Sequence, residues 1–167
     1  MARRNTYQHV FTRDVPVEIK AAFDWMTDYS QEDMRFYDSE SGSRSFERLA
    51  PDKIRLITVE KERRHNIRIE GIVTLSPPKH WTYTGVMLRD AKAIASFNEY
   101  FSLEALDHEM TRFTIRLEAK PLTVSFRLYT TLFRRKLDEW LDKPHDRIVR
   151  AMVSECGANN MLAKAGA

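Results

Sequence analysis

A carboxylate set between aromatic residues is the pattern in this sequence that most suggests chemistry. Side chains of a strand alternate between its two faces, so Phe97, Glu99 and Phe101 share one face. Burial there would raise the pKa of the carboxyl group, making it a proton donor or acceptor, or an anchor for a ligand's hydroxyl or amine. A single β-bulge would instead turn Asn98 and Tyr100 inward and leave Glu99 on a solvated rim. This surface position is the default interpretation.

Two further residues are weak candidates for proton transfer alongside Glu99. His9 lies in the first strand-like segment, and Tyr83 alternates with Trp81 and Met87 in a later one. Gly85 interrupts that alternation and leaves space where a side chain would stand, which suggests either a widened cavity or ordinary sheet curvature.

Other catalytic classes lack their sequence signatures. The chain shows no Ser-His-Asp order, Gly-rich phosphate loop or metal-ligand spacing, so neither a cofactor nor a metal is expected. The histidines show no clustering typical of a metal site: His9, His65, His80, His108 and His145. Cys156 is the only cysteine, which excludes an internal disulfide and favours a reducing, cytoplasmic compartment.

Length and composition predict a single globular domain with one core. The chain has 167 residues, of which 43% are apolar and 31% charged. Its net charge of +3 is small, and the basic runs at 63–64 and 134–136 have acidic neighbours, so no nucleic-acid partner is expected. No apolar run approaches the roughly 18 residues of a spanning helix, so no integral membrane segment is expected. We expect a monomer or a weak dimer.

The elements that would position these residues follow from hydrophobic periodicity. A strand is predicted at 7–12, an amphipathic helix at 16–26 led by a proline, and a second short helix at 30–36. The period then changes to two, and turn residues separate the segments. Consecutive hairpins predict an antiparallel meander of six strands at 45–49, 54–60, 67–75, 81–88, 96–106 and 112–119.

The final segment, 126–156, returns to helical spacing. Its apolar stripe includes Tyr129, Phe133, Leu137 and Trp140, which could form a cavity wall, although plain core packing is the commoner role of such a stripe. A kink or break is predicted between 141 and 145, because Pro144 cannot donate a hydrogen bond to the preceding turn. A glycine at 157 is the expected helix end, giving a domain at 1–157 and a flexible tail at 158–167.

This order of elements resembles the helix-grip fold of the START, Bet v 1 and polyketide-cyclase (SRPBCC) superfamily. Local carriers of the resemblance are the segments 10–18 (VFTRDVPVE) and 22–28 (AFDWMTD). The resemblance implies an α+β fold in which seven curved antiparallel strands wrap a long C-terminal helix, with two short helices after the first strand. It also implies an apolar cavity between sheet and helix. Members bind lipids, hormones, quinones or polyketides, and some are cyclases or dehydratases, so the fold does not settle the function.

Two functions are therefore expected in order of preference. The first is binding or carriage of a small hydrophobic ligand (aromatic, isoprenoid or acyl), and the alternative is a polyketide cyclase- or dehydratase-like enzyme using acid-base residues. A protein-interaction module would need an exposed apolar patch, which the sequence does not show. The predicted ligand-binding residues are Trp81, Tyr83, Met87, Phe97, Glu99, Phe101, Tyr129, Phe133, Leu137 and Trp140.

Overall fold

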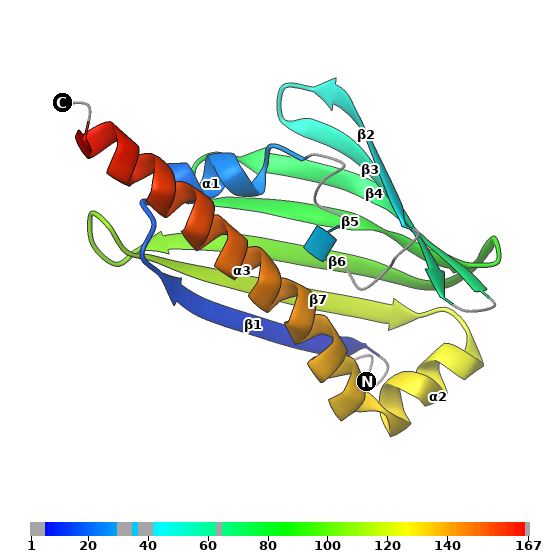
Figure 1. Ribbon diagram of the computed structural model, residues 1–167. Helices are drawn as coiled ribbons and strands as arrows, with labels where there is room; N and C mark the ends of the chain where they lie inside the picture. The colour runs from blue at the N-terminus through cyan, green and yellow to red at the C-terminus, as the bar shows by residue number, and fades with distance from the viewer. Residues whose placement is uncertain (1–5, 30–34, 37–41, 63–64, 166–167) are drawn as a thin grey trace.

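Seven antiparallel strands form one curved sheet in the computed structural model, which describes residues 6–29, 35–36, 42–62 and 65–165 (Figure 1). The strand order is β1-β7-β6-β5-β4-β3-β2, so the six later strands form the predicted meander and the first strand pairs with the last. The bounds are β1 (Tyr7–Val15), β2 (Ser43–Ala50), β3 (Lys53–Glu62), β4 (His65–Ser76), β5 (His80–Arg89), β6 (Lys92–Ala105) and β7 (Thr111–Pro121).

Helix α1 (Ile19–Met26) follows β1 and packs on the sheet. It begins three residues later than predicted from Pro16, because Val17 is buried and its N–H closes a turn onto the Val15 carbonyl. The Phe23 ring then meets Trp81 edge-on at 5.6 Å. The second predicted helix lies largely outside the described residues, and only Phe36 and the residue before it, in a 3₁₀ turn, belong to the described part.

The C-terminal helical segment breaks at Phe133, which separates α2 (Val124–Leu132) from α3 (Arg134–Ala165). The hydroxyls of Thr130 and Thr131 both donate to the Arg127 carbonyl, and such local bonds compete with the helical ladder near this end. The prediction of an unbroken helical piece from 126 to 141 was therefore wrong at this point.

Of the kink or break predicted near Pro144, the break was wrong, because α3 continues through the proline. The kink stays a prediction. A proline inside a helix removes one backbone hydrogen bond, and burial of the residues on both sides can hold the helix together. Leu137, Val149 and Met152 provide that burial. Gly157 likewise does not end the helix, and the domain boundary placed there stays a prediction. Within the described residues, no helix has the length and apolar character needed to cross a membrane.

The long helix α3 crosses the concave side of the sheet, with the core between them (Figure 1). Trp81 is the largest fully buried side chain, and its ring stacks on Phe101 at 4.9 Å and on Phe113 at 6.3 Å. Aromatic residues of β5, β6 and β7 therefore form one continuous layer under the helix. Trp81 and Phe101 of this layer also line the site described below, on its sheet side.

Gly71 of β4 and Gly85 of β5 lie directly opposite each other in the sheet. A Cβ added to Gly85 would collide with the Glu70 carbonyl oxygen and lie 2.8 Å from the Gly71 Cα, so the two backbones approach too closely for side chains. The glycine pair thus permits the close approach of β4 and β5, and the choice between sheet curvature and a widened cavity stays a prediction.

Candidate ligand-binding cavity

A cavity of about 160 Å³ lies between the concave side of the sheet and α3. Its walls are predominantly apolar, and α3 contributes Trp140, Leu141, Pro144 and Ile148. The remaining apolar lining comes from the sheet, α1 and α2: Met26, Ile69, Tyr83, Met87, Ala95, Phe97, Phe101, Ile115, Leu117, Ala119 and Phe126. Four polar residues join this lining: Thr58, Glu60, Glu99 and His145.

A second chamber of about 90 Å³ adjoins the first. The two chambers share Met26, Tyr83, Glu99, Phe101 and Ile148 as common walls. The second chamber is also lined by other residues, which include Trp25, Tyr29, Phe36, Arg44 and Trp81. Since a cavity of about 150 Å³ accommodates a benzene ring, the main chamber suits one ring and both together suit a larger molecule.

Glu99 faces the cavity and not the solvent. The pairing of β5 with β6 is regular from Ala95 to Ser102, and the only irregularity in it lies near Met87, closer to the hairpin. No β-bulge therefore turns Glu99 to the solvent face, and its side chain is only 16% exposed. Asn98 is on the outer face, where it accepts a hydrogen bond from Thr84. The default interpretation of Glu99 as a rim residue was wrong.

Burial changes the protonation of Glu99 and its neighbour His145. Loss of solvation raises the pKa of Glu99 to about 7, against a smaller opposing effect of the Arg44 charge. Loss of solvation, with the repulsion of His9, lowers the pKa of His145 to about 4. Glu99 Oε1 lies 3.8 Å from His145 Nε2. Near neutral pH the pair thus combines a carboxyl group that is about half protonated with a neutral imidazole.

These two groups can share one polar ligand atom. Their separation of 3.8 Å is too long for a direct hydrogen bond, yet both line the same cavity. A hydroxyl or carbonyl oxygen held between them could accept from the Glu99 carboxyl, and a hydroxyl could also donate to His145 Nε2. The arrangement also suits proton transfer, because a positioned acid and base face the same space.

His9 is buried but does not line the cavity, contrary to its predicted role. Its Nε2 lies 3.0 Å from Asp142 Oδ1 and its Nδ1 lies 3.4 Å from Asp138 Oδ1, so α3 covers it from the solvent side. Its ring stacks on His145 at 6.5 Å between centroids. The Tyr7 hydroxyl donates to the same Asp138 carboxylate over 2.5 Å, and burial raises the pKa of Tyr7. His9 therefore contacts the site only through its packing on the His145 ring.

Most of the predicted ligand-binding residues meet at the two chambers. The main chamber is lined by Tyr83, Met87, Phe97, Glu99, Phe101 and Trp140, and Trp81 lines the second. Leu137 instead belongs to the packed core. Tyr129 and Phe133 are exposed and lie outside the lining, because α2 turns Phe126 inward and the break at Phe133 interrupts the helical phase.

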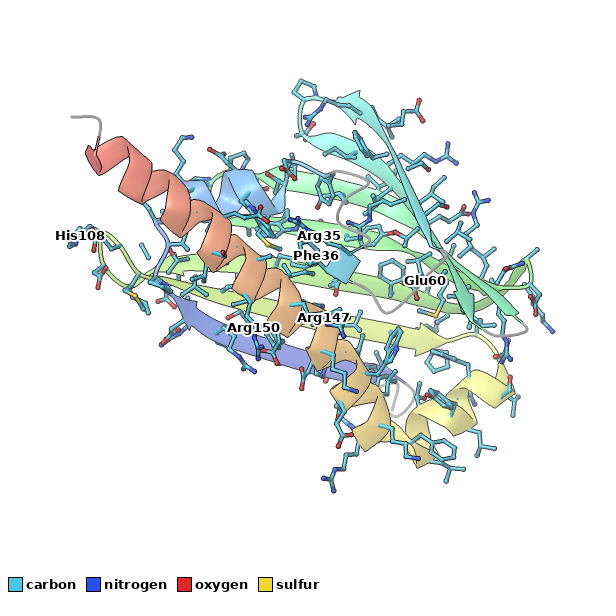
Figure 2. The ribbon with its side chains drawn as sticks, in the orientation of Figure 1. Arg35, Phe36, Glu60, His108, Arg147 and Arg150 are labelled. Atoms are coloured by element: carbon cyan, nitrogen blue, oxygen red, sulfur yellow. The ribbon has the colours of Figure 1, made fainter. Side chains whose placement is uncertain are left out.

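Several residues of the site were missed in the sequence. His145 follows Leu137 and Leu141 at four-residue spacing, so the helical periodicity itself could have placed it on the inner side of α3. Arg44 and Glu60 had no such signal, because charged residues on outer strands normally point to solvent. Both are buried here, and Glu60 projects on the same side of the sheet as α3 (Figure 2).

Among the described residues, no group of three or more His, Cys, Asp or Glu side chains is arranged to hold a metal ion. A polar groove of the outer sheet face is separate from the cavity and is bordered by Arg13, Arg112 and Arg116. Asp14 accepts two hydrogen bonds from Arg112 there, which lowers the pKa of Asp14.

The fold is that of solved aromatase/cyclase structures. The chain superposes on the di-domain ARO/CYC StfQ from the steffimycin biosynthetic pathway with a TM-score of 0.70 and 12% identity, covering 93% of this chain and 53% of that one. The di-domain ARO/CYC BexL from the BE-7585A biosynthetic pathway superposes with a TM-score of 0.69 and 11% identity, covering 92% of this chain and 50% of that one. The Zhui aromatase/cyclase from Streptomyces sp. R1128 superposes with a TM-score of 0.68 and 11% identity, covering 91% of this chain and 94% of that one.

These likenesses establish the architecture of the chain, which is the helix-grip fold. By sequence, no family model and no curated protein matches it. The predicted fold is thus confirmed, with the second short helix only partly matched.

Proposed function

We propose that this protein binds a small hydrophobic molecule in the cavity between the sheet and α3, with the polar group of the ligand at Glu99 and His145. The observation that carries the proposal is an apolar, aromatic-walled cavity into which the carboxyl group of Glu99 and the imidazole of His145 converge. Ligand sites typically combine apolar walls with a few convergent polar groups and perturbed pKa values. The fold shared with the aromatase/cyclases supports the same interpretation.

Ring stacking should decide how the ligand lies. Phe97 meets Tyr83 edge-on at 4.9 Å, and Phe101 stacks on Trp81, so the cavity offers flat aromatic surfaces. A planar or unsaturated ligand of about two rings suits these surfaces and the combined volume of the chambers. 2-Naphthol is a suitable probe, because it carries one hydroxyl on two fused rings.

The test is a calorimetric titration with 2-naphthol. We expect a dissociation constant on the order of 10–100 µM for a probe of this size. Ala95→Leu places a larger side chain in the cavity and should weaken binding about tenfold or more, because Ala95 is buried in its wall. Ala93→Leu is the matched control on the same strand, since Ala93 is exposed. Absence of binding, or equal effects of the two variants, would contradict the proposal.

A second function, acid-base catalysis of the cyclase or dehydratase type, is favoured by the Glu99–His145 pair itself. For a ketone in the cavity, His145 Nε2 would remove a proton from the carbon next to the carbonyl while the Glu99 carboxyl protonates the carbonyl oxygen. The product is the enol, and the reverse steps return both protons. Such positioned groups typically contribute a factor of about 10²–10⁴.

Deuterium exchange tests this chemistry without a natural substrate. 2-Tetralone in D₂O should exchange its α-hydrogens faster with the protein than without it, as followed by proton NMR. His145→Gln should remove at least about 90% of the acceleration, since the amide is no base. Glu47→Gln is the control, because Glu47 is exposed on β2. An acceleration that survives His145→Gln would exclude this pair as the catalyst and leave the binding proposal standing.

A further inference from the structure

The outward face of α2 is apolar, although it looks away from the protein. Val124, Leu128 and Leu132 recur at four-residue spacing and are 80%, 57% and 64% exposed. The opposite side of the same helix holds Phe126, which lines the cavity, and the buried Thr130. A surface helix normally carries polar residues opposite its buried side, so α2 has an unpartnered apolar face.

More exposed apolar residues surround this face. Leu122 precedes the helix, Tyr129 lies on it, and Phe133 and Trp140 follow it, all of them exposed. Tyr129 and Phe133 contact each other, with ring centroids 5.5 Å apart. Single exposed apolar residues are ordinary, whereas a contiguous group marks an interaction site. The exposed apolar patch that the sequence did not reveal is thus present, and we call it the α2 face.

The charge around the α2 face has one sign. Residues 122–137 contain Arg127, Arg134, Arg135 and Lys136 but neither Asp nor Glu. All four basic side chains belong to exposed residues. Lys136 Nζ lies 5.8 Å from the centre of the Phe133 ring, so basic and apolar groups are adjacent. The first acidic residues beyond the segment are Asp138 and Glu139, and Glu139 pairs with Arg135.

We infer that the α2 face docks on an anionic lipid surface. The apolar residues would enter the boundary between headgroups and acyl chains, and the basic residues would contact the headgroups. Aromatic rings such as those of Tyr129, Phe133 and Trp140 favour this interfacial depth. The combination of apolar face, aromatic rim and local excess of basic residues is what an anionic bilayer surface complements.

Docking there would bring the cavity close to the bilayer. Phe126, on the inner side of α2, and the partly exposed Trp140 both belong to the cavity lining, so the cavity lies directly behind the α2 face. A hydrophobic ligand can then move between bilayer and cavity with little exposure to water. Membrane docking does not depend on this transfer, and its test needs no ligand.

Vesicle co-sedimentation of the full chain tests the inference. Vesicles of phosphatidylcholine with about one-third phosphatidylglycerol should bind the protein at least about tenfold better than pure phosphatidylcholine, and about 0.5 M NaCl should remove most of the difference. The variant Leu128→Glu/Leu132→Glu should lose about tenfold or more in binding. Phe46→Glu/Leu49→Glu is the matched control, because both residues are comparably exposed on β2.

A second pair of variants tests the contribution of the basic residues to vesicle binding. Arg127→Glu should weaken binding to the anionic vesicles, whereas Arg150→Glu, on α3 and away from α2 in Figure 2, should change it less. Thermal melts confirm that every variant is folded. Equal binding to both vesicle types, or no binding to either, would overturn the inference. So would a dimer in light scattering that Leu128→Glu/Leu132→Glu dissociates, because the face would then contact a second copy.

Discussion

Glu99→Gln is expected to stabilise the protein above neutral pH and to leave its stability at about pH 4 nearly unchanged. In the unfolded chain the carboxyl has its ordinary pKa of 4.5, whereas in the folded protein burial raises the pKa to about 7. At a pH below both pKa values the carboxyl group is protonated in the folded and the unfolded state, so its ionisation does not change the free energy of unfolding. As the pH rises between them, the unfolded state ionises first, so folding loses stability. Glutamine removes this loss because it does not ionise.

The size of the effect follows from the difference between the two pKa values. One unit corresponds to about 1.4 kcal/mol, so the gain from Glu99→Gln approaches about 3 kcal/mol at about pH 8.5. Urea unfolding of both proteins at several pH values measures it. Glu47→Gln should show no such trend, because Glu47 is an exposed strand residue. A gain that is the same at every pH would mean that the Glu99 carboxylate is not buried in the folded state.

Gly85→Ala is expected to destabilise the fold by about 2–3 kcal/mol or to prevent folding. The added methyl group would overlap the Glu70 carbonyl, which is backbone and cannot rotate away. Relief requires β4 and β5 to separate where Gly71 opposes Gly85, at the expense of ladder hydrogen bonds. Thermal and urea unfolding measure the loss.

Gly157→Ala is the control for this prediction. Gly157 lies inside α3 with open space around it, so the same substitution should be neutral or stabilising by up to about 1 kcal/mol. If both variants were equally stable, the close approach of β4 and β5 would not be a feature of the folded protein.

The sheet could be predicted from sequence because its signals are local. Alternation in segments such as Trp81, Tyr83 and Met87 and the turn residues between strands locate the hairpins, and antiparallel order follows from short connections. The break at Phe133 in the long helical segment was harder to predict from the sequence. Its apolar stripe continues across Phe133, where the structure breaks the helix, and local hydrogen bonds from threonine hydroxyls to the Arg127 carbonyl leave no mark in that periodicity.

The site could be predicted only as far as strand periodicity reaches. Phe97, Glu99 and Phe101 share a face in the sequence, but that periodicity does not say whether the face is the inner or the outer one. The register shift near Met87, which helps to set it, became visible only in the strand pairing. The pairing of Glu99 with His145 joins a strand and a helix, so no spacing within either segment encodes it. Exposure of the α2 face likewise depends on how the helix sits on the sheet.

A crystal structure of the complex with 6-bromo-2-naphthol tests the central claim most directly, because anomalous scattering locates the bromine. We predict the rings against Phe97 and Phe101 in the cavity, with the hydroxyl oxygen within about 3.2 Å of a side-chain atom of Glu99 or His145. A saturated crystal that placed the ligand only in the outer groove near Arg112, or left the cavity empty, would contradict the claim that this cavity is the binding site.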